Sequence, residues 1–366
     1  MAKAQDILKL TKAQTKKAPV APKVDNSGLL PYSPELVHGY EPDFTDGYKM
    51  KQGNHYLTVS DIVKPVKANR NLFLVGPTGT GKSTLASKII DILNKEILDE
   101  NRIIHGRNLP LIAAGVPVEK LERYHDLKYK RVMYNGHIGT RTEHMVGTID
   151  VQYDVNGNRT AVRVPGFLTY PFVTPGCKLV WDEMDMTLPE VLGEAHAYLD
   201  GRSNVIDVFL NGRWQLHKQK DFSVIATANT LGNGENQNEY AGTNPLNKAF
   251  LNRLNYVVHL EYLPHDGEVK LLTSKMKFRK DIAEAMVVVA NETREAKKNQ
   301  SVEYALSTRD LFSWVGACID DDNHRDSLSK ETYWNNIALK YIYPTFLNRI
   351  DDEAIREAYH TFLTLR

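Results

Sequence analysis

The stretch Gly76-Pro77-Thr78-Gly79-Thr80-Gly81-Lys82-Ser83 fits the pattern G-x-x-x-x-G-K-[ST], in which a backbone loop closes round a chain of phosphates. Glycines allow the backbone N–H groups of such a loop to point inward at the anion. In this pattern Lys82 reaches the β and γ phosphates, and the hydroxyl of Ser83 ligates Mg²⁺. The predicted nucleotide contacts are Gly76, Pro77, Thr78, Gly79, Thr80, Gly81, Lys82, Ser83 and Thr84.

The residues on either side of this loop have the patterns of a buried strand and of a helix. Residues 71–75 form a short apolar run of the kind that a buried parallel strand needs. After the loop, apolar residues recur at helical spacing, at Leu85, Ile89, Ile92, Leu93 and Ile97. A helix that starts here presents its N-terminus to the same anion. The order strand, loop, helix is the context that the motif requires.

The composition is that of a globular protein with an ordinary surface. The chain has 366 residues, of which 42% are hydrophobic and 25% charged, enough for a large core and about two domains. The net charge of +1 argues against a global basic field for nucleic acid. Cys177 and Cys318 lack metal-binding spacing and indicate free thiols. Without an apolar segment of ~18 residues or a secretory signal, we expect a cytoplasmic protein with no membrane contact.

Three parts of the chain differ in pattern. Residues 1–30 are rich in Lys, Ala and Pro and predict a flexible basic arm. Residues 31–265 alternate strand and helix patterns, which predicts an α/β domain with a parallel sheet. Residues 266–366 show only helical patterns and predict a small all-helical domain. The expected strands are Leu72–Val75, Arg131–Tyr134, Lys178–Trp181, Phe222–Ala226 and Tyr256–Leu260. The expected helices of the last part are Lys280–Lys298, Thr308–Ile319, Glu331–Tyr341 and Asp351–Leu363, with Asp266, Ser307 and Asp351 as N-caps.

Two β-hairpins are expected within the α/β part. Each has an Asn-Gly pair between alternating strands, Asn156-Gly157 in the first and Asn211-Gly212 in the second. Basic residues lie in or near both hairpins, at Arg159, Arg163, Arg213, Lys218 and Lys220. A basic strip of this kind is a feature of nucleic-acid contact, so a translocase or helicase is one alternative function.

Two carboxylates follow the predicted strand 178–181. Hydrolysis of a bound nucleotide requires a metal orienter and a group that aligns the attacking water. Asp182 is the candidate for holding Mg²⁺ beside Ser83, and Glu183 for polarising the water. The carboxyl ends of parallel strands are where ligands bind in such sheets.

Three further polar residues complete the candidate set. Asn229 follows the predicted strand 222–226, where its amide would bond the γ-phosphate or the lytic water. Arg253 and Arg309 are candidates for an arginine that stabilises the transferred phosphoryl group, in cis or in trans.

These elements, in this order, resemble the AAA+ ATPases, and within them the MoxR-like branch and the CobS-type ATPase subunits of cobaltochelatase. The most specific resemblance lies in residues 226–232 (Ala-Thr-Ala-Asn-Thr-Leu-Gly), 240–244 (Tyr-Ala-Gly-Thr-Asn) and 260–265 (Leu-Glu-Tyr-Leu-Pro-His). By resemblance, Gly76 to Ser83 is the Walker A loop, Asp182 and Glu183 are Walker B, Asn229 is sensor one, Arg253 the arginine finger and Arg309 the sensor-two arginine. The two hairpins resemble the inserts of this clade, and Asn135 the residue that restrains Glu183.

The resemblance implies an AAA+ α/β domain followed by a helical lid. It also implies an ATP hydrolase that uses ATP and Mg²⁺, forms a homo-oligomeric, hexameric ring, and has a partner with a metal-dependent adhesion-type (von Willebrand factor A) domain. The expected work is remodelling of a partner protein or metallocofactor complex. A nucleotide-gated scaffold with little turnover is a further alternative. The chain departs from the family in its basic arm, in the extra residues 103–130 and in Asn252 before Arg253.

Overall fold

The computed structural model describes residues 34–38, 49–153, 158–209, 212–230, 246–321 and 327–363. The expected arm, the turn residues Asn156, Gly157 and Asn211, and residues 231–232 and 240–244 of the resemblance lie outside these ranges. The chain forms two compact units, Met1–Gly39 with Lys95–Leu127 and Tyr40–Asn94 with Lys128–Arg366. The domain boundaries expected from the sequence, 1–30, 31–265 and 266–366, stay a prediction.

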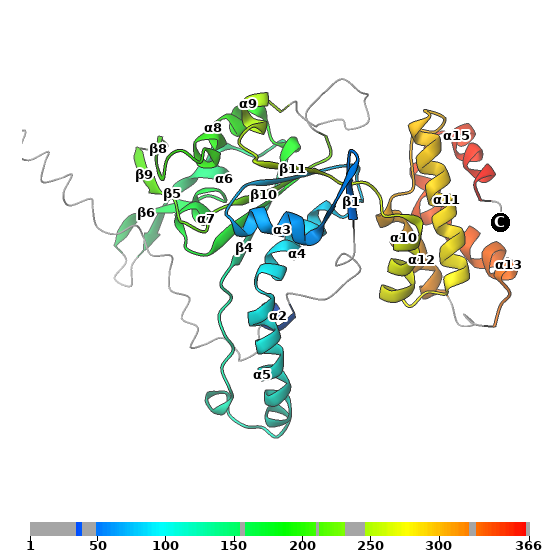
Figure 1. Cartoon of the computed structure of the whole chain (residues 1–366), viewed down its shortest axis with the longest axis horizontal. Coiled ribbons are helices and arrows are strands. Elements are labelled where there is room, and N and C mark those ends of the chain that lie inside the picture. Colours follow the sequence, from blue (N-terminus) through cyan, green and yellow to red (C-terminus); the bar gives the residue numbers. More distant parts are fainter. Residues whose placement is uncertain are drawn as a thin grey trace, which may run out of the picture. The chain divides into compact units, whose positions relative to one another are not determined.

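A five-stranded parallel sheet is the core of the α/β part of the larger unit (Figure 1). Its order is β11-β3-β10-β7-β4, so the strand before the phosphate loop lies between two strands that come much later in the chain. The strands are β3 (Leu72–Val75), β4 (Lys130–Asn135), β7 (Cys177–Asp182), β10 (Val224–Ala228) and β11 (Tyr256–His259). All five expected strands belong to this sheet, which confirms the α/β fold class.

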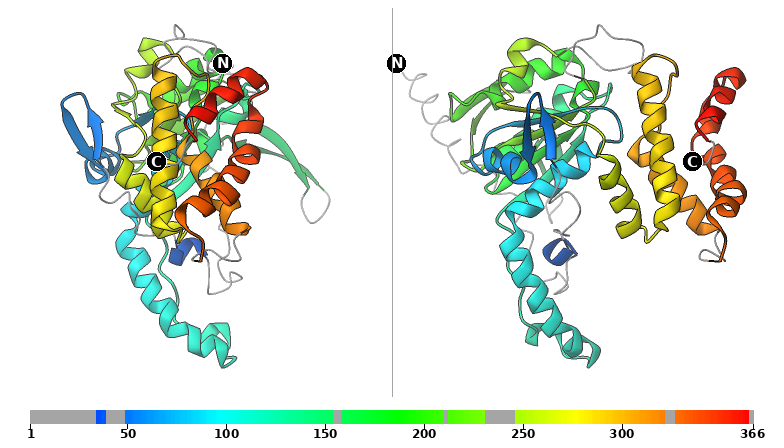
Figure 2. Two further views of the ribbon diagram at one scale, coloured as in Figure 1. Left: turned by 90° about the vertical axis from the view of Figure 1, so that its right-hand side faces the viewer. Right: turned by 45° about the vertical axis from the view of Figure 1, so that its right-hand side comes forward.

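Helices and hairpins surround this sheet within the same unit. The helical segments are α3 (Val59–Lys67), α4 (Lys82–Leu93), α6 (Thr142–Val146), α7 (Thr169–Val173), η4 (Met184–Met186), α8 (Pro189–Leu199) and α9 (Lys248–Leu251). The antiparallel hairpins are β1 (Lys49–Gln52) with β2 (His55–Thr58), β5 (Gly147–Tyr153) with β6 (Arg159–Pro165), and β8 (Val205–Phe209) with β9 (Arg213–His217). Figure 2 shows β5 and β6 as a long ribbon that extends away from the sheet.

Both faces of the sheet are covered by apolar side chains. Alternate residues of a strand point to opposite faces, so Phe73 and Val75 join one cluster while Leu72 and Leu74 join the other. The first cluster includes α7, α8 and the β8–β9 hairpin, and the second includes α3 and α4. This two-sided burial explains why the strands are continuous apolar runs in the sequence.

Residues 265–363 form a bundle of helices with its own apolar core (Figure 2). Its segments are α10 (His265–Lys275), α11 (Lys280–Lys298), α12 (Thr308–Asp320), α13 (Lys330–Tyr333), the π-helical η6 (Trp334–Ala338), α14 (Leu339–Thr345), η7 (Leu347–Arg349), α15 (Glu353–Ala358) and η8 (Tyr359–Thr361). The helix expected over Glu331–Tyr341 therefore contains a π-helical turn, and the one expected over Asp351–Leu363 starts later and ends in a 3₁₀ turn.

One of the three expected N-caps is confirmed and two are wrong. The Ser307 side chain accepts a hydrogen bond from the Asp310 backbone N–H at the start of α12. Pro264, with its fixed φ, is the N-cap of α10, so Asp266 lies inside that helix. Asp352, one residue after the expected Asp351, caps α15 by accepting from two backbone N–H groups. No described helix is both long and apolar enough to span a bilayer.

The smaller unit contains most of the extra residues that the family resemblance leaves unexplained. It includes α2 (Pro34–His38), the long α5 (Lys95–Ala113) and η3 (Val118–Lys120). Buried Asn101 on α5 bonds the backbone of His125 in both directions, and it also donates to the Leu36 carbonyl. Asn108 bonds the Glu122 backbone in the same reciprocal way. Two amide side chains thus hold the returning segment against one face of α5.

Candidate active site

The phosphate loop connects β3 to α4 and is enclosed by two later segments of the chain. A Cβ atom at Gly76 would lie 2.1 Å from the carbonyl oxygen of Leu260, so only glycine fits there. Gly79 has a φ of +80°, and a Cβ on it would lie 2.5 Å from the Cβ of Ser307. The loop therefore touches both the end of β11 and the start of α12, which is possible because these positions have no side chain.

Lys82 is the first residue of α4, and its side chain is buried beneath the loop. Its ammonium donates to the carbonyl oxygens of Gly76 at 2.7 Å and Pro77 at 2.8 Å, and to Oδ1 of Asn229 at 3.0 Å. Burial lowers the pKa of Lys82 to about 8, against the opposing effect of nearby carboxylates. All three contacts are neutral oxygens, so this cation lacks a direct anionic partner among the residues described.

Ser83 and Asp182 lie side by side, as the sequence predicts. The Ser83 hydroxyl donates to Oδ1 of Asp182 at 2.8 Å, and Thr227 of β10 donates to the same oxygen. Asp182 is 8% exposed. A hydroxyl and a carboxylate that meet next to a phosphate loop are oxygen donors of the kind that Mg²⁺ takes, so the residues present fit this ion.

Glu183 follows Asp182 with its backbone in the left-handed region, at a φ of 50° and a ψ of 44°. Its backbone N–H donates to Oγ1 of Thr227 at 3.0 Å, which fixes this bend. The side chain is exposed. Left-handed backbone is unfavourable for a residue with a Cβ, and such strain is often found at functional positions. Thr227, which sequence reasoning missed, thus contacts both the Asp182 carboxylate and the Glu183 backbone.

Asn229 is positioned by a buried acid that no sequence motif indicates. Asp185 lies in η4 with no solvent exposure, and its Oδ2 accepts from the backbone N–H groups of Asn229 at 2.9 Å and Thr230 at 3.3 Å. Burial raises the pKa of Asp185. Its other oxygen, Oδ1, has no hydrogen-bond partner among the described residues. Asn229 in turn accepts from Lys82, so a short chain of contacts connects Asp185 to the phosphate loop.

Arg309 and the phosphate loop approach each other within the larger unit. An ideal Cβ on Gly79 would lie 3.6 Å from the backbone N of Arg309, and the Arg309 charge contributes to lowering the pKa of Lys82. The side chain of Arg309 is exposed. Two cationic residues therefore lie near the loop, which favours an anionic ligand there.

Arg253 is placed at the other end of the sheet. Its carbonyl oxygen accepts from the side chain of Asn71, the residue before β3, at 3.1 Å. Its guanidinium donates to the Ala249 carbonyl oxygen at 2.6 Å and lies 3.9 Å from Asp200. The phosphate loop follows the last residue of β3, a strand that spans about 13 Å. Arg253 is therefore separated from the phosphate loop of its own chain by the length of the sheet.

Most of the basic residues in or near the two hairpins form ion pairs or ring contacts within the chain. Arg213 forms a two-pronged ion pair with Asp207. Arg163 lies over the ring of Trp214, and Lys218 over that of Phe222, where burial lowers its pKa. These contacts give the expected nucleic-acid strip no added support.

Sequence comparisons agree with this geometry. A family model described as AAA domain (dynein-related subfamily) matches residues 118–254, and one described as CbbQ/NirQ/NorQ C-terminal matches residues 268–318. The aerobic cobaltochelatase subunit CobS of a Sinorhizobium species is 27% identical over 281 residues, which cover 75% of this chain and 72% of that protein. An uncharacterised protein of Staphylococcus saprophyticus is 24% identical over 255 residues, which cover 69% of this chain and 80% of that protein.

Among solved structures, the RuvB Holliday junction branch migration motor of Thermotoga maritima is similar at 12% identity and a TM-score of 0.45, covering 82% of this chain and 73% of that one. The family assignment depends on the sequence matches and on the parallel sheet with its phosphate loop. Together they support an AAA-type ATP hydrolase that is similar to the MoxR-like branch and to CobS.

Proposed function

We propose that this protein is a ring-forming motor, a hexamer, in which each ATP site is shared between two neighbouring subunits. One subunit contributes the phosphate loop, Asp182, Glu183 and Asn229, and the next contributes Arg253. The energy of hydrolysis is used to remodel a partner protein or metallocofactor complex. The similarity to a cobaltochelatase subunit supports this class of work. The partner with a von Willebrand factor A domain is what the family resemblance implies.

The position of Arg253 carries this proposal. The residue lies beside Asn71 at the amino end of β3, whereas Lys82 and Asp182 lie at the carboxyl ends of the strands. Phosphoryl transfer gains about 10³–10⁵-fold from an inserted arginine. An arginine that is remote from its own site but half-buried at 25% side-chain exposure is suited to serve the site of a neighbour. Rings arise when such a head-to-tail contact closes.

Within one site the residues have distinct tasks. Lys82 exchanges its neutral oxygen partners for the phosphates of ATP, and Asn229 remains beside it to bond the γ-phosphate or the attacking water. Glu183, exposed and with a left-handed backbone, accepts the proton of that water. Arg309 follows the start of α12 beside the phosphate loop, and its task in this proposal is to report the γ-phosphate to the helical bundle. When bound, Mg²⁺ would be held through Ser83 and Asp182 and would neutralise phosphate charge.

A mixing experiment tests the shared site. Glu183→Gln and Arg253→Ala are each expected to be inactive alone while still binding ATP. In a shared site, an equal mixture restores activity, because Glu183 of one variant meets Arg253 of the other. Random assembly predicts about a quarter of the wild-type rate per subunit.

A second mixture is the matched control. Lys82→Ala combined with Glu183→Gln must stay inactive, because both defects lie on the same side of the interface and no site is complete. Recovery in this control, or no recovery with Arg253→Ala, would show that the site is not divided as proposed. A wild-type rate per subunit that is flat down to monomeric concentrations would also contradict the ring. Binding of ATP without hydrolysis by the wild-type protein, with or without partner, would favour a scaffold.

A further inference from the structure

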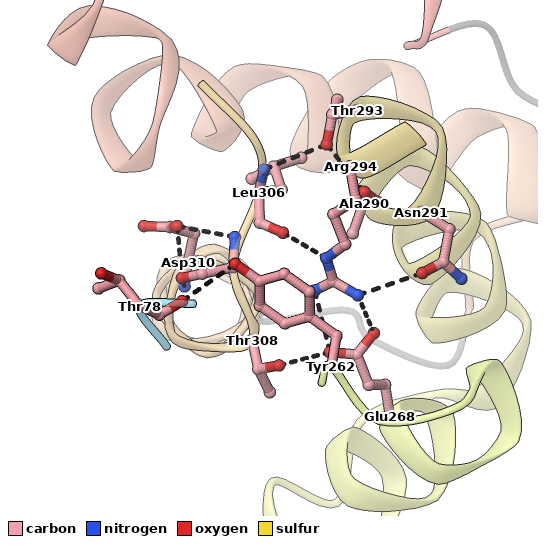
Figure 3. A network of polar contacts seen from close by, with 11 residues as sticks. Thr78, Tyr262, Glu268, Ala290, Asn291, Thr293, Arg294, Leu306, Thr308 and Asp310 are labelled. Atoms are coloured by element: carbon pink, nitrogen blue, oxygen red, sulfur yellow. Dashed lines mark hydrogen bonds and ion pairs between the residues drawn. The ribbon is translucent and has the colours of Figure 1, made fainter. Parts of the chain in front are cut away.

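A buried arginine in the helical bundle has contacts that lead toward the phosphate loop. Arg294 of α11, which is 6% exposed, forms a two-pronged ion pair with fully buried Glu268 of α10, at 2.7 and 3.0 Å (Figure 3). Its Nε also donates to the carbonyl oxygen of Leu306 at 2.7 Å. Burying such a pair seldom adds net stability compared with apolar side chains, so its presence calls for another explanation.

The pair fixes the segment that starts α12. Leu306 is bonded from two sides, because its carbonyl accepts from Arg294 and its N–H donates to Thr293. Two residues later, the Thr308 hydroxyl donates to the same Glu268 carboxylate that Arg294 binds. Arg309 comes next in the chain. The ion pair thus fixes the backbone position from which the Arg309 side chain extends.

Tyr262 connects this network to the phosphate loop. It lies between β11 and α10, and the Arg294 guanidinium is 3.9 Å from the centre of its ring. Its hydroxyl donates to the carbonyl oxygen of Thr78 at 3.0 Å (Figure 3). A guanidinium stacked on an aromatic ring and bound on its edge by a carboxylate has little freedom to move. A shift of the Thr78 carbonyl therefore reaches Arg294 through a single side chain.

We propose that Tyr262, Arg294 and Glu268 are positioning residues that set Arg309 relative to the phosphate loop. This inference depends on the proposed role of Arg309 toward the γ-phosphate. Tyr262 contacts both the phosphate loop and Arg294, so it fixes the distance between the loop and the start of α12. The position of the start of α12 therefore depends on the loop. None of the three residues needs to touch the nucleotide for this role.

The same bundle supplies a matched control. Arg279 forms a two-pronged ion pair with Asp281, at 2.9 and 2.7 Å, and lies 5.1 Å from the centre of the Tyr333 ring. It has the same three parts as the first cluster, an arginine, a carboxylate and a tyrosine. Tyr333, however, is fully buried in the apolar core of the bundle, whereas Tyr262 reaches the loop.

The test compares kcat, KM and nucleotide affinity of full-length variants. Arg294→Lys retains the charge but cannot bond Leu306 and both Glu268 oxygens, so we expect about a tenfold fall in kcat with nucleotide affinity nearly unchanged. Tyr262→Phe removes a single hydroxyl and should lower kcat about fivefold. Arg279→Lys should leave kcat and nucleotide affinity within about twofold of the wild-type values. If Arg294→Lys lowers kcat no more than Arg279→Lys, the inference is wrong.

Double variants separate this inference from the proposed function. In an Arg309→Ala background, Arg294→Lys and Tyr262→Phe should cause no further loss, because they act through Arg309. Losses that multiply instead would overturn the positioning role. If Arg309→Ala alone has the wild-type kcat, the proposed role of Arg309 fails. If Arg309→Ala is slow while Tyr262→Phe is not, only the present inference fails.

Discussion

Lys82 and Lys178 are buried at opposite ends of the same parallel sheet, and burial lowers the pKa of each to about 8. Lys178 lies in β7 and is fully buried. Its ammonium donates to four oxygen atoms, which belong to Val66, Asn69, Asp221 and Ser223. Lys82 has three, all from the phosphate loop and Asn229.

The difference lies in whether those partners can be replaced. The oxygens around Lys178 belong to segments that the lysine joins at the amino end of the sheet, so they are part of the fold. Those around Lys82 belong to a loop with exposed Pro77 and Thr78, and phosphate oxygens can take their place. A lysine ammonium with a similarly lowered pKa therefore stabilises the fold at Lys178, whereas at Lys82 its partners can be replaced by a ligand.

The largest expected effect comes from exchanging each lysine for methionine, which is similar in length and uncharged. Lys82→Met should lower the hydrolysis rate at least about 10³-fold, because the phosphates lose their buried cation, with stability within about 1 kcal/mol of wild type. Lys178→Met should instead lower stability and leave the hydrolysis rate nearly unchanged. Four buried oxygens lose a donor, which costs about 3 kcal/mol in unfolding free energy, while kcat per folded molecule stays within about twofold. Urea unfolding and ATPase rates, measured on the same samples, check the stability and the activity of both variants. If each variant loses stability and activity together, the contrast between Lys82 and Lys178 is wrong.

The pH dependence of ATP affinity gives the next largest effect. ATP binds the charged form of Lys82, so above pH 8 the free protein must take up a proton on binding. Affinity should therefore fall as pH rises, by about tenfold per pH unit between pH 8 and 10. Calorimetry in buffers of different ionisation enthalpy measures this proton uptake. Lys82→Met should bind weakly and show no such slope, whereas Lys178→Met should show the wild-type slope.

The smallest effect concerns Asp185, the first of the carboxylates whose charge raises the pKa of Lys82. Asp185→Asn retains an oxygen for the Asn229 and Thr230 backbone but removes the charge. The pH at which ATP affinity begins to fall should then move to a lower value, with kcat reduced about threefold or less. Asp221→Asn, near Lys178, is the control and should leave this profile unchanged. An unchanged profile in Asp185→Asn would mean that the two groups are not coupled.

Local sequence patterns were sufficient for the five strands and the phosphate loop but not for the pairing of the strands. The five strands are apolar runs, and the phosphate loop has its own pattern, so both could be predicted. The order of the strands depends on contacts between distant segments, which one sequence does not reveal. The helix expected to run from Leu85 to Ile97 is divided at Asn94, whose amide bonds the Tyr129 backbone in both directions. That pairing too joins distant residues.

The candidate site shows the same limit. Lys82, Ser83, Asp182 and Asn229 were predicted from motifs, and the structure places them together; their catalytic roles remain predictions. Asp185 was missed because it reads as one more acid in an acidic turn, and only the 3₁₀ turn of η4 brings it beneath Asn229. Arg294 resembles a solvated residue near the end of a charged helix. Its burial depends on how α10 and α12 pack against α11.

The left-handed backbone at Glu183 bears on how this protein can lose its activity over generations. The bend costs about 1 kcal/mol for any residue with a Cβ, and glycine would relieve it. If Glu183 has the proposed role, its replacement by glycine would remove turnover and relieve the backbone strain, so this change would be tolerated wherever selection for hydrolysis is relaxed. Glutamine would retain the strain. Glycine at this position in a duplicated copy would therefore mark a nucleotide-binding protein that has given up turnover.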